Sequence, residues 1–158
     1  MIFVVYDGNY KPKKPFDKLV NIVYENFIHL KKYPELNHNI KTIRETVANK
    51  DKIIILCFDN HYKRILGYLI GYNIVLNDGR FVTFISYIYV STQLRSKGIG
   101  SKILNICFKE SEMRGCEGIM LTCNTQDKHI MKFYEEKGFM LDFNLRRYTK
   151  YDILFKTT

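Results

Sequence analysis

A run of small and cationic residues at positions 95–101, with the sequence RSKGIGS, has the composition of an anion site. Glycine has no Cβ atom, so Gly98 and Gly100 would let ligand oxygens approach the backbone N–H groups closely. Arg95 and Lys97 would add positive charge, and the two serine hydroxyls would add hydrogen-bond donors. The run predicts a cradle for a phosphate or pyrophosphate group, although a tight turn with a solvated loop fits the same residues.

The elements on either side of this run favour the anion site. The β-branched and aromatic stretch 81–91 is typical of a strand, and the apolar spacing of 98–114 is typical of a helix. The first N–H groups of a helix lack internal partners and carry a partial positive charge. The spacing matches neither the G-x-x-x-x-G-K-[ST] of a P-loop nor the G-x-G-x-x-G of a dinucleotide site.

A second group of residues with possible chemistry lies further along the chain. Tyr134 stands on a predicted helix, with Ile130 and Phe133 on the same apolar face, and Asp127 is a suitable N-cap for it. Cys123 ends an apolar run, where a free thiol behaves as a small hydrophobic group. By themselves these residues fit a helix cap and a core.

Composition limits the classes of function. The chain has 158 residues, with 25 basic and 16 acidic side chains, so its net charge of +9 favours anionic partners such as nucleotide phosphates, nucleic acid or acidic proteins. Nucleic-acid binding is disfavoured because basic residues cluster only at 11–14 and 146–147. The four cysteines lack zinc spacing, which predicts no metal and no disulfides. The absence of a long apolar run predicts no membrane span and a cytoplasmic protein.

The remaining elements follow from periodicity and turn residues. Segments 52–59, 64–77 and 81–91 are expected to form an antiparallel meander, because turn-forming residues separate them. Two N-terminal helices are expected to form a small lid. The whole of 1–158 is predicted to be a single α/β domain. The other predicted strands are 2–6, 119–123, 139–143 and 151–156, and the other predicted helices are 16–31, 36–49 and 128–137.

Two motifs taken together resemble those of the GNAT superfamily of acetyl-CoA-dependent N-acetyltransferases. Arg95, Gly98 and Gly100 match its motif [Q/R]-x-x-G-x-[G/A] between a strand and a helix. The segment 133–139, FYEEKGF, matches F-Y-x-x-x-G-F on the following helix. The resemblance extends over roughly residues 52–156.

The resemblance implies the GNAT fold, an α/β fold with a mixed, mostly antiparallel sheet that splays between strands 81–91 and 119–123. The pantetheine arm of acetyl-CoA would lie in that wedge, and residues 95–101 would hold the pyrophosphate. Asp127 replaces an Asn that contacts pantetheine in many relatives, and N-capping is its alternative role. The cofactor-binding residues implied are Ile88, Tyr89, Val90, Arg95, Ser96, Lys97, Gly98, Ile99, Gly100, Ser101, Asp127 and Phe133.

The resemblance also implies transfer of an acetyl group to a primary amine by direct attack in a ternary complex. Tyr134 would act as the general acid that protonates the departing thiolate. Strand 81–91 carries no carboxylate to act as base, so Tyr87, a water chain or an amine of low pKa are the alternatives. An acetyl-enzyme on Cys123 is a further alternative.

The acceptor and the assembly state stay open. Segments 119–127, 133–142 and 151–156 are weakly similar to histone-directed N-alpha-acetyltransferases, and a shorter stretch is similar to glucosamine-6-phosphate acetyltransferases. The basic composition favours an acidic peptide or a sugar phosphate as the acceptor. A non-catalytic CoA-binding or basic interaction module is the alternative function, and either a monomer or a homodimer is compatible with the sequence.

Overall fold

The computed structural model describes residues 1–9, 15–142 and 151–158, in which seven strands form one mixed sheet in the order β1-β2-β3-β4-β5-β7-β6. Every neighbouring pair is antiparallel except β4 and β5, which are parallel. The predicted meander is thus confirmed as β2-β3-β4. The strands are β1 (Ile2–Tyr6), β2 (Lys52–Phe58), β3 (Ile65–Val75), β4 (Phe81–Val90), β5 (Gly118–Asn124), β6 (Met140–Leu141) and β7 (Tyr151–Thr157).

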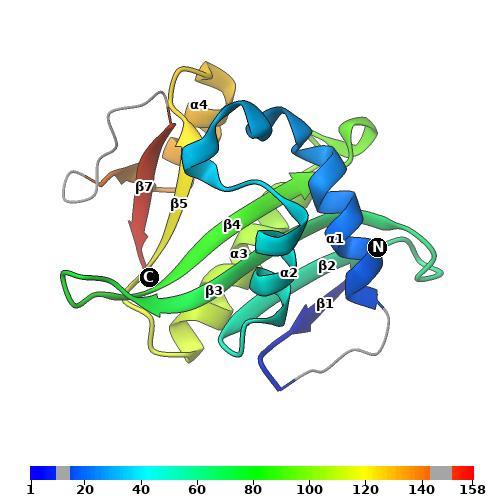
Figure 1. Cartoon of the computed structure of the whole chain (residues 1–158), viewed down its shortest axis with the longest axis horizontal. Coiled ribbons are helices and arrows are strands. Elements are labelled where there is room, and N and C mark those ends of the chain that lie inside the picture. The colour runs from blue at the N-terminus through cyan, green and yellow to red at the C-terminus, as the bar shows by residue number, and fades with distance from the viewer. Residues whose placement is uncertain (10–14, 143–150) are drawn as a thin grey trace.

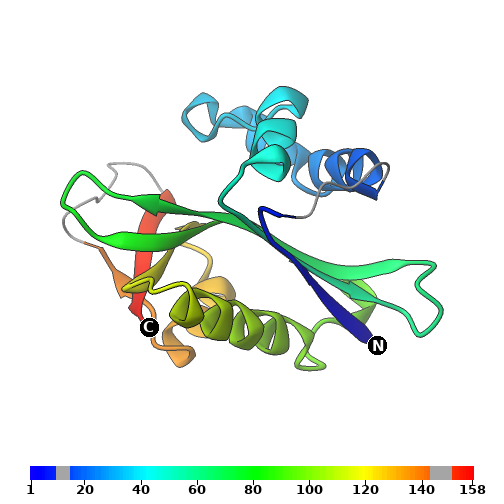
Figure 2. The ribbon, with the colours of Figure 1, turned by 90° about the horizontal axis from the view of Figure 1, so that it is seen from below.

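Helices cover both faces of this sheet (Figure 2). Helices α1 (Pro15–Asn26) and α2 (Ile40–Ala48) pack on one face, and α3 (Ile99–Met113) and α4 (Lys128–Glu136) pack on the other. The two N-terminal helices expected to form a small lid or cap are present, and their apolar faces are buried against the strands.

Strand β2 shows why the sheet needs both layers. Ile53 and Ile55 point to the α3 side, whereas Ile54 and Leu56 point to the α1 side, and all four are at most 1 % exposed. Successive side chains of a strand point to opposite faces, so an unbroken apolar run indicates a strand buried on both sides.

Three predicted elements are clearly shorter than expected. The helix predicted over 36–49 is α2, which begins only at Ile40 and ends at Ala48. The helix predicted over 16–31 ends at Asn26, and 3-10 helices at Ile28–Lys32 (η1) and Pro34–Leu36 (η2) lead to α2. A proline disfavours helical backbone at the residue before it, which is consistent with the break between η1 and η2 at Tyr33. The strand predicted over 139–143 is Met140–Leu141, and residue 143 lies outside the described residues, as do the basic clusters at 11–14 and 146–147.

Candidate active site

Strands β4 and β5 separate half-way along their length. Within the described residues their pairing runs from Val82 opposite Gly118 to Ile85 opposite Leu121. Beyond that point β4 stays paired with β3 and β5 stays paired with β7, so the two strands diverge toward α4 (Figure 1). This confirms the predicted splay, which opens a wedge where the facing backbone edges of β4 and β5 no longer pair with each other.

A β-bulge in β4 accompanies the divergence. Ile70 of β3 lies opposite Tyr87 and Gly71 lies opposite Ile85, so Ser86 is an extra residue without an opposite Cα partner on β3. An extra residue reverses the alternation of side chains along the strand. Ile85 accordingly packs on the α3 side, whereas Tyr87 packs on the α1 side.

The loop predicted to hold an anion has a backbone shaped for that role. Ser96 and Gly98 both adopt left-handed conformations, with φ of 63° and 78°. Gly98 is the N-cap of α3. It has no side chain that could accept a hydrogen bond from the first N–H groups of this helix. A left-handed conformation is uncommon for a residue other than glycine and costs about 1–2 kcal/mol. Residues with such backbone strain often lie at functional sites.

The cations of this loop lie on the surface beside the wedge. Arg95 and Lys97 are both exposed. The Arg95 Nε atom donates to the Val90 carbonyl at 3.1 Å, and its guanidinium carbon lies 5.6 Å from the centroid of the Tyr89 ring. Arg95 is therefore held at the end of β4, between the wedge and the loop.

Val90, Gly100 and Phe133, which are all predicted to bind the cofactor, lie close together. A Cβ atom placed on Gly100 would lie 3.5 Å from Cζ of Phe133 and 3.7 Å from Cγ2 of Val90. Strand β4, helix α3 and helix α4 thus converge where the wedge meets the loop. Phe133 is only partly buried and packs at the edge of the core on this side.

Tyr134 lies in the core on the α3 side of the wedge. It is 7 % exposed and shares a cluster with Cys123, Ile85 and Phe139, whose ring centroid lies 5.4 Å from that of Tyr134. Burial, with a smaller contribution from Cys123, raises the pKa of Tyr134 above its ordinary value. Tyr134 therefore keeps its proton throughout the neutral range, as a general acid must.

Asp127 serves as the N-cap of α4. Its Oδ1 atom accepts hydrogen bonds from the backbone N–H groups of His129 at 3.0 Å and Ile130 at 3.2 Å. The capping role considered for this residue is thus observed.

On the α1 side of the sheet the structure reveals a buried pair that sequence reasoning did not find. The ring nitrogen Nδ1 of His38 lies 2.8 Å from the Tyr87 hydroxyl, and Nε2 lies 2.9 Å from the carbonyl oxygen of Tyr24. His38 and Tyr87 are 6 % and 9 % exposed. Burial raises the pKa of Tyr87 to about 12. Only the fold could show the pair, because the two residues lie 49 positions apart.

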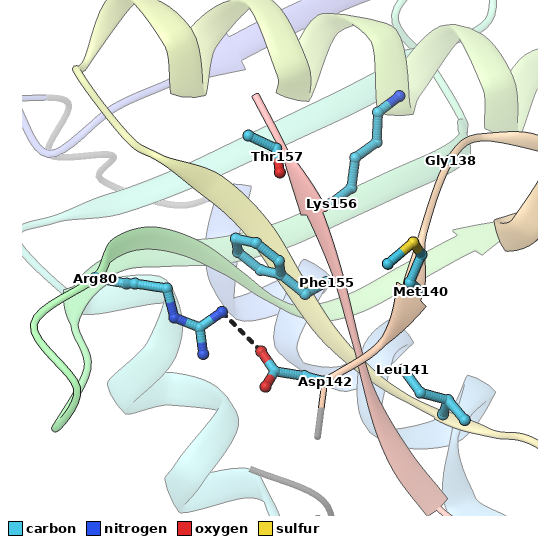
Figure 3. Close-up of a pocket in the computed structure, with 8 residues that line it drawn as sticks. All are labelled: Arg80, Gly138, Met140, Leu141, Asp142, Phe155, Lys156 and Thr157. Carbon is cyan, nitrogen blue, oxygen red and sulfur yellow. Dashed lines mark ion pairs between the residues drawn. The ribbon is translucent and has the colours of Figure 1, made fainter. Parts of the chain in front are cut away.

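A hollow of about 280 Å³ lies elsewhere, at the end of the sheet where β4 and β5 are still paired (Figure 3). Arg80 points into it and forms ion pairs with Asp78 and Asp142, both at 2.8 Å. These carboxylates already balance the guanidinium charge, so Arg80 offers little attraction to a further anion. The hollow is lined by Arg80, Gly138, Met140, Leu141, Asp142, Phe155, Lys156 and Thr157.

Two features are absent from the described residues. In residues 1–9, 15–142 and 151–158, no group of three or more His, Cys, Asp or Glu side chains is arranged to hold a metal ion. In the same ranges, no helix has the length and apolar character needed to cross a membrane.

Comparison with known protein families gave one match. The model of the acetyltransferase (GNAT) family matches residues 16–139, which include the loop at 95–101 and the segment 133–139. No curated protein sequence matches the chain significantly.

Several solved structures share the fold. An acyl-CoA N-acyltransferase from Pseudomonas aeruginosa superimposes with a TM-score of 0.75 at 15% identity, over 98% of both chains. NAA60 from Arabidopsis thaliana in complex with acetyl-CoA gives 0.68 at 15% identity, over 99% of this chain and 98% of that one. The NatC complex bound to Gag peptide and CoA gives 0.64 at 16% identity, over 100% of this chain and 99% of that one.

Proposed function

The chain belongs to the acetyltransferase (GNAT) family, and from this premise we propose that it transfers the acetyl group of acetyl-CoA to a primary amine by direct attack in a ternary complex. We further propose that residues 1–158 form one acetyltransferase domain. A cytoplasmic location is part of the proposal, because Cys57, Cys107 and Cys116 are buried thiols without a disulfide, as is usual in a reducing compartment.

The observation that carries the proposal is the wedge between β4 and β5, which opens next to the N-terminus of α3. An extended pantetheine arm would lie there as an additional strand and pair with the backbone of Ile88 and with the N–H of Val90, whose carbonyl accepts from Arg95. Its pyrophosphate would reach the N–H groups at Gly98–Ser101 and the charges of Arg95 and Lys97. NAA60, which shares the fold, was solved with acetyl-CoA.

Tyr134 is proposed as the general acid. Its ring packs with Cys123 of β5, beyond the point where β5 leaves β4, so it lies beside the proposed path of the pantetheine arm. When the amine has attacked the thioester carbon and the C–S bond breaks, the Tyr134 hydroxyl would give its proton to the sulfur. The phenol would recover a proton from the nitrogen of the new amide.

The acceptor is proposed to be a primary amine of a peptide, a protein or a small molecule. Peptides with a free α-amino group come first in a screen, because the NatC complex with the same fold holds a peptide together with CoA. The net charge of +9 places acidic peptides ahead of basic ones.

The test is release of CoA thiol from acetyl-CoA in the presence of candidate amines, with mass spectrometry of the product. The panel contains acidic and basic peptides with free N-termini, the same peptides with blocked N-termini, spermidine and glucosamine-6-phosphate. Acetylated product that requires a free amine supports the proposal. Tight acetyl-CoA binding without transfer to any member of the panel would favour the non-catalytic CoA-binding module, and faster turnover of spermidine would overturn the preference for acidic acceptors.

A further inference from the structure

A buried hydrogen-bonded chain connects β4 to the carboxyl end of α1. It runs from the Tyr87 hydroxyl to Nδ1 of His38, and from Nε2 of His38 to the Tyr24 carbonyl. The rings of Tyr24 and His38 are stacked, with centroids 5.4 Å apart and planes 6° apart, and Phe27 packs on Tyr87 at 5.0 Å. The imidazole is therefore fixed in position and orientation.

The partners of His38 determine where its proton lies. A carbonyl oxygen can only accept a hydrogen bond. Nε2 of His38 therefore carries a proton and donates a hydrogen bond to the Tyr24 carbonyl. In the neutral imidazole Nδ1 is then a lone pair, and it accepts the proton of the Tyr87 hydroxyl. A phenol whose proton points at a basic nitrogen is prepared to pass that proton on as it accepts another.

We infer that Tyr87 and His38 form a proton relay that deprotonates the acceptor's ammonium group before it attacks the thioester. The inference rests on the proposed function. It assigns a base to the reaction although β4 carries no carboxylate. Tyr87 would contact the amine, and His38 would act through Tyr87.

The position of Tyr87 in the sheet supports this role. Tyr87 is the first residue after the bulge at Ser86, on the part of β4 that borders the wedge. The bulge turns its side chain to the α1 face, whereas Tyr134 packs on the α3 face. A thioester held in the wedge would then have the base on one face and the acid on the other, so the amine approaches from the side opposite the departing sulfur.

The proton balance of the step is closed. One ammonium proton moves to the Tyr87 oxygen while the Tyr87 proton moves to Nδ1 of His38, which becomes an imidazolium. The neutral amine forms the C–N bond, the C–S bond breaks, and the thiolate takes the Tyr134 proton. The second nitrogen proton restores Tyr134, and the imidazolium releases its extra proton to solvent through Tyr87.

Apart from His38, Tyr87 contacts no titratable or charged side chain through a hydrogen bond or ring contact in the described part of the chain. Tyr24 and Lys31 contact each other, Tyr68 and Tyr89 are stacked, and Arg95 lies over Tyr89. The titratable or charged side chains around the pair, from α1, η1, β3, β4 and the loop after β4, are Tyr24, His29, Lys31, Tyr68, Tyr89 and Arg95.

The test compares turnover of a peptide with a free α-amino group by wild type, His38→Asn and Tyr87→Phe, at neutral and at alkaline pH. Asn keeps a hydrogen-bond acceptor near Nδ1 but cannot take up a proton. An α-amino group has a pKa near ~8, so at a pH of about 9.5 the amine is already neutral and needs no base. At pH ~7 roughly a tenth of the amine is neutral, so both variants should turn over roughly 10-fold more slowly there and approach the wild-type rate at pH ~9.5. The double variant should be no slower than either single one.

Tyr68→Phe is the matched control. It also removes one buried phenolic hydroxyl from the same core cluster, but the Tyr68 oxygen accepts its hydrogen bond from Nδ2 of Asn26. We expect turnover close to wild type at both pH values. If His38→Asn does not fold, Tyr87→Phe alone carries the test, since it leaves His38 in place.

The outcomes separate the relay from the function on which it rests. Wild-type transfer with variant rates that are unchanged, or reduced equally at both pH values, would overturn the relay and leave the proposed function standing. A folded wild type that shows neither acetyl-CoA binding by calorimetry nor transfer would overturn both.

Discussion

At the scale of single residues, the proposed chemistry depends on tyrosine hydroxyls rather than on carboxylates. Tyr87 and Tyr134 are both buried, and burial raises the pKa of each. A phenol that holds its proton so firmly is a poor base by itself, which is why Tyr87 needs the imidazole of His38. The same property keeps Tyr134 protonated until a thiolate forms beside it.

Replacing Tyr134 by Phe should slow turnover by roughly 100-fold, because the thiolate loses its proton donor. The affinity for acetyl-CoA should change little, since only one hydroxyl group is removed. Steady-state kinetics and calorimetry measure the two effects separately. Turnover equal to wild type would show that another group, or water, protonates the sulfur.

Individual site residues differed in how far the sequence could predict them. Gly98 and Gly100 were predicted as site residues because a junction of a strand and a helix is a local pattern, and the structure shows that Gly98 is the left-handed N-cap of α3. Asp127 was identified as an N-cap for the same reason. His38 carries no local signal, because its role depends on contacts with α1 and β4 that only the tertiary structure creates.

At the scale of elements, the proposed site lies where a parallel pair of strands separates. The bulge at Ser86 directs Ile88 and Val90 toward α3, and Tyr87 and Tyr89 toward α1. The order of strands and helices could be predicted from periodicity and turn residues. The bulge could not, since residues 81–90 alternate without any irregular glycine or proline that would mark it.

Acetyl-CoA should slow amide hydrogen exchange in segment 86–91, because the ligand would pair with the edge of β4 that β5 no longer covers there. Mass spectrometry of the exchanged peptides measures this effect. The pair β1-β2, which is hydrogen-bonded along its length, is the internal reference and should not change. Protection centred on 138–142 and 155–157 would instead place the ligand in the hollow beside Arg80.

At the scale of the whole molecule, the sheet divides the protein into two sides with different proposed tasks. The α3 and α4 side would hold the cofactor and the acid, and the α1 and α2 side would receive the amine and hold the base. The short 3-10 helices after α1 belong to this division, since ending the helix at Asn26 leaves the Tyr24 carbonyl for His38. Sequence periodicity extended that helix too far because it does not register such a tertiary partner.

Stability should fall in alkaline solution as buried phenols are forced to ionise. The pKa of Tyr87 is raised from 10.0 to about 12, so in this interval the unfolded chain releases a proton that the folded protein retains. The stabilisation is complete below pH ~10 and is lost as the pH rises toward ~12, at up to ~1.4 kcal/mol per pH unit for each such group. Burial also raises the pKa of Tyr68, Tyr134 and Cys107.

Denaturant unfolding at a series of pH values measures this loss. Tyr87→Phe should reduce the slope of the free energy of unfolding against pH above ~10. Tyr62→Phe is the control, because that side chain is 59 % exposed, and its slope should match wild type. Equal slopes in Tyr87→Phe and wild type would contradict the burial of the Tyr87 phenol.

The most direct test of the central claim is calorimetric titration of acetyl-CoA into wild type, Gly98→Trp and Gly115→Trp. Both glycines are left-handed, with φ of 78° and 77°, and a Cβ atom at either meets nothing within 4 Å, so the two substitutions impose similar backbone strain. Only Gly98 lies in the proposed pyrophosphate cradle. We predict micromolar binding by wild type and Gly115→Trp, and binding weakened by at least roughly 100-fold, about 2.7 kcal/mol, in Gly98→Trp. Equal binding by the two variants, or none by a folded wild type, would contradict the site.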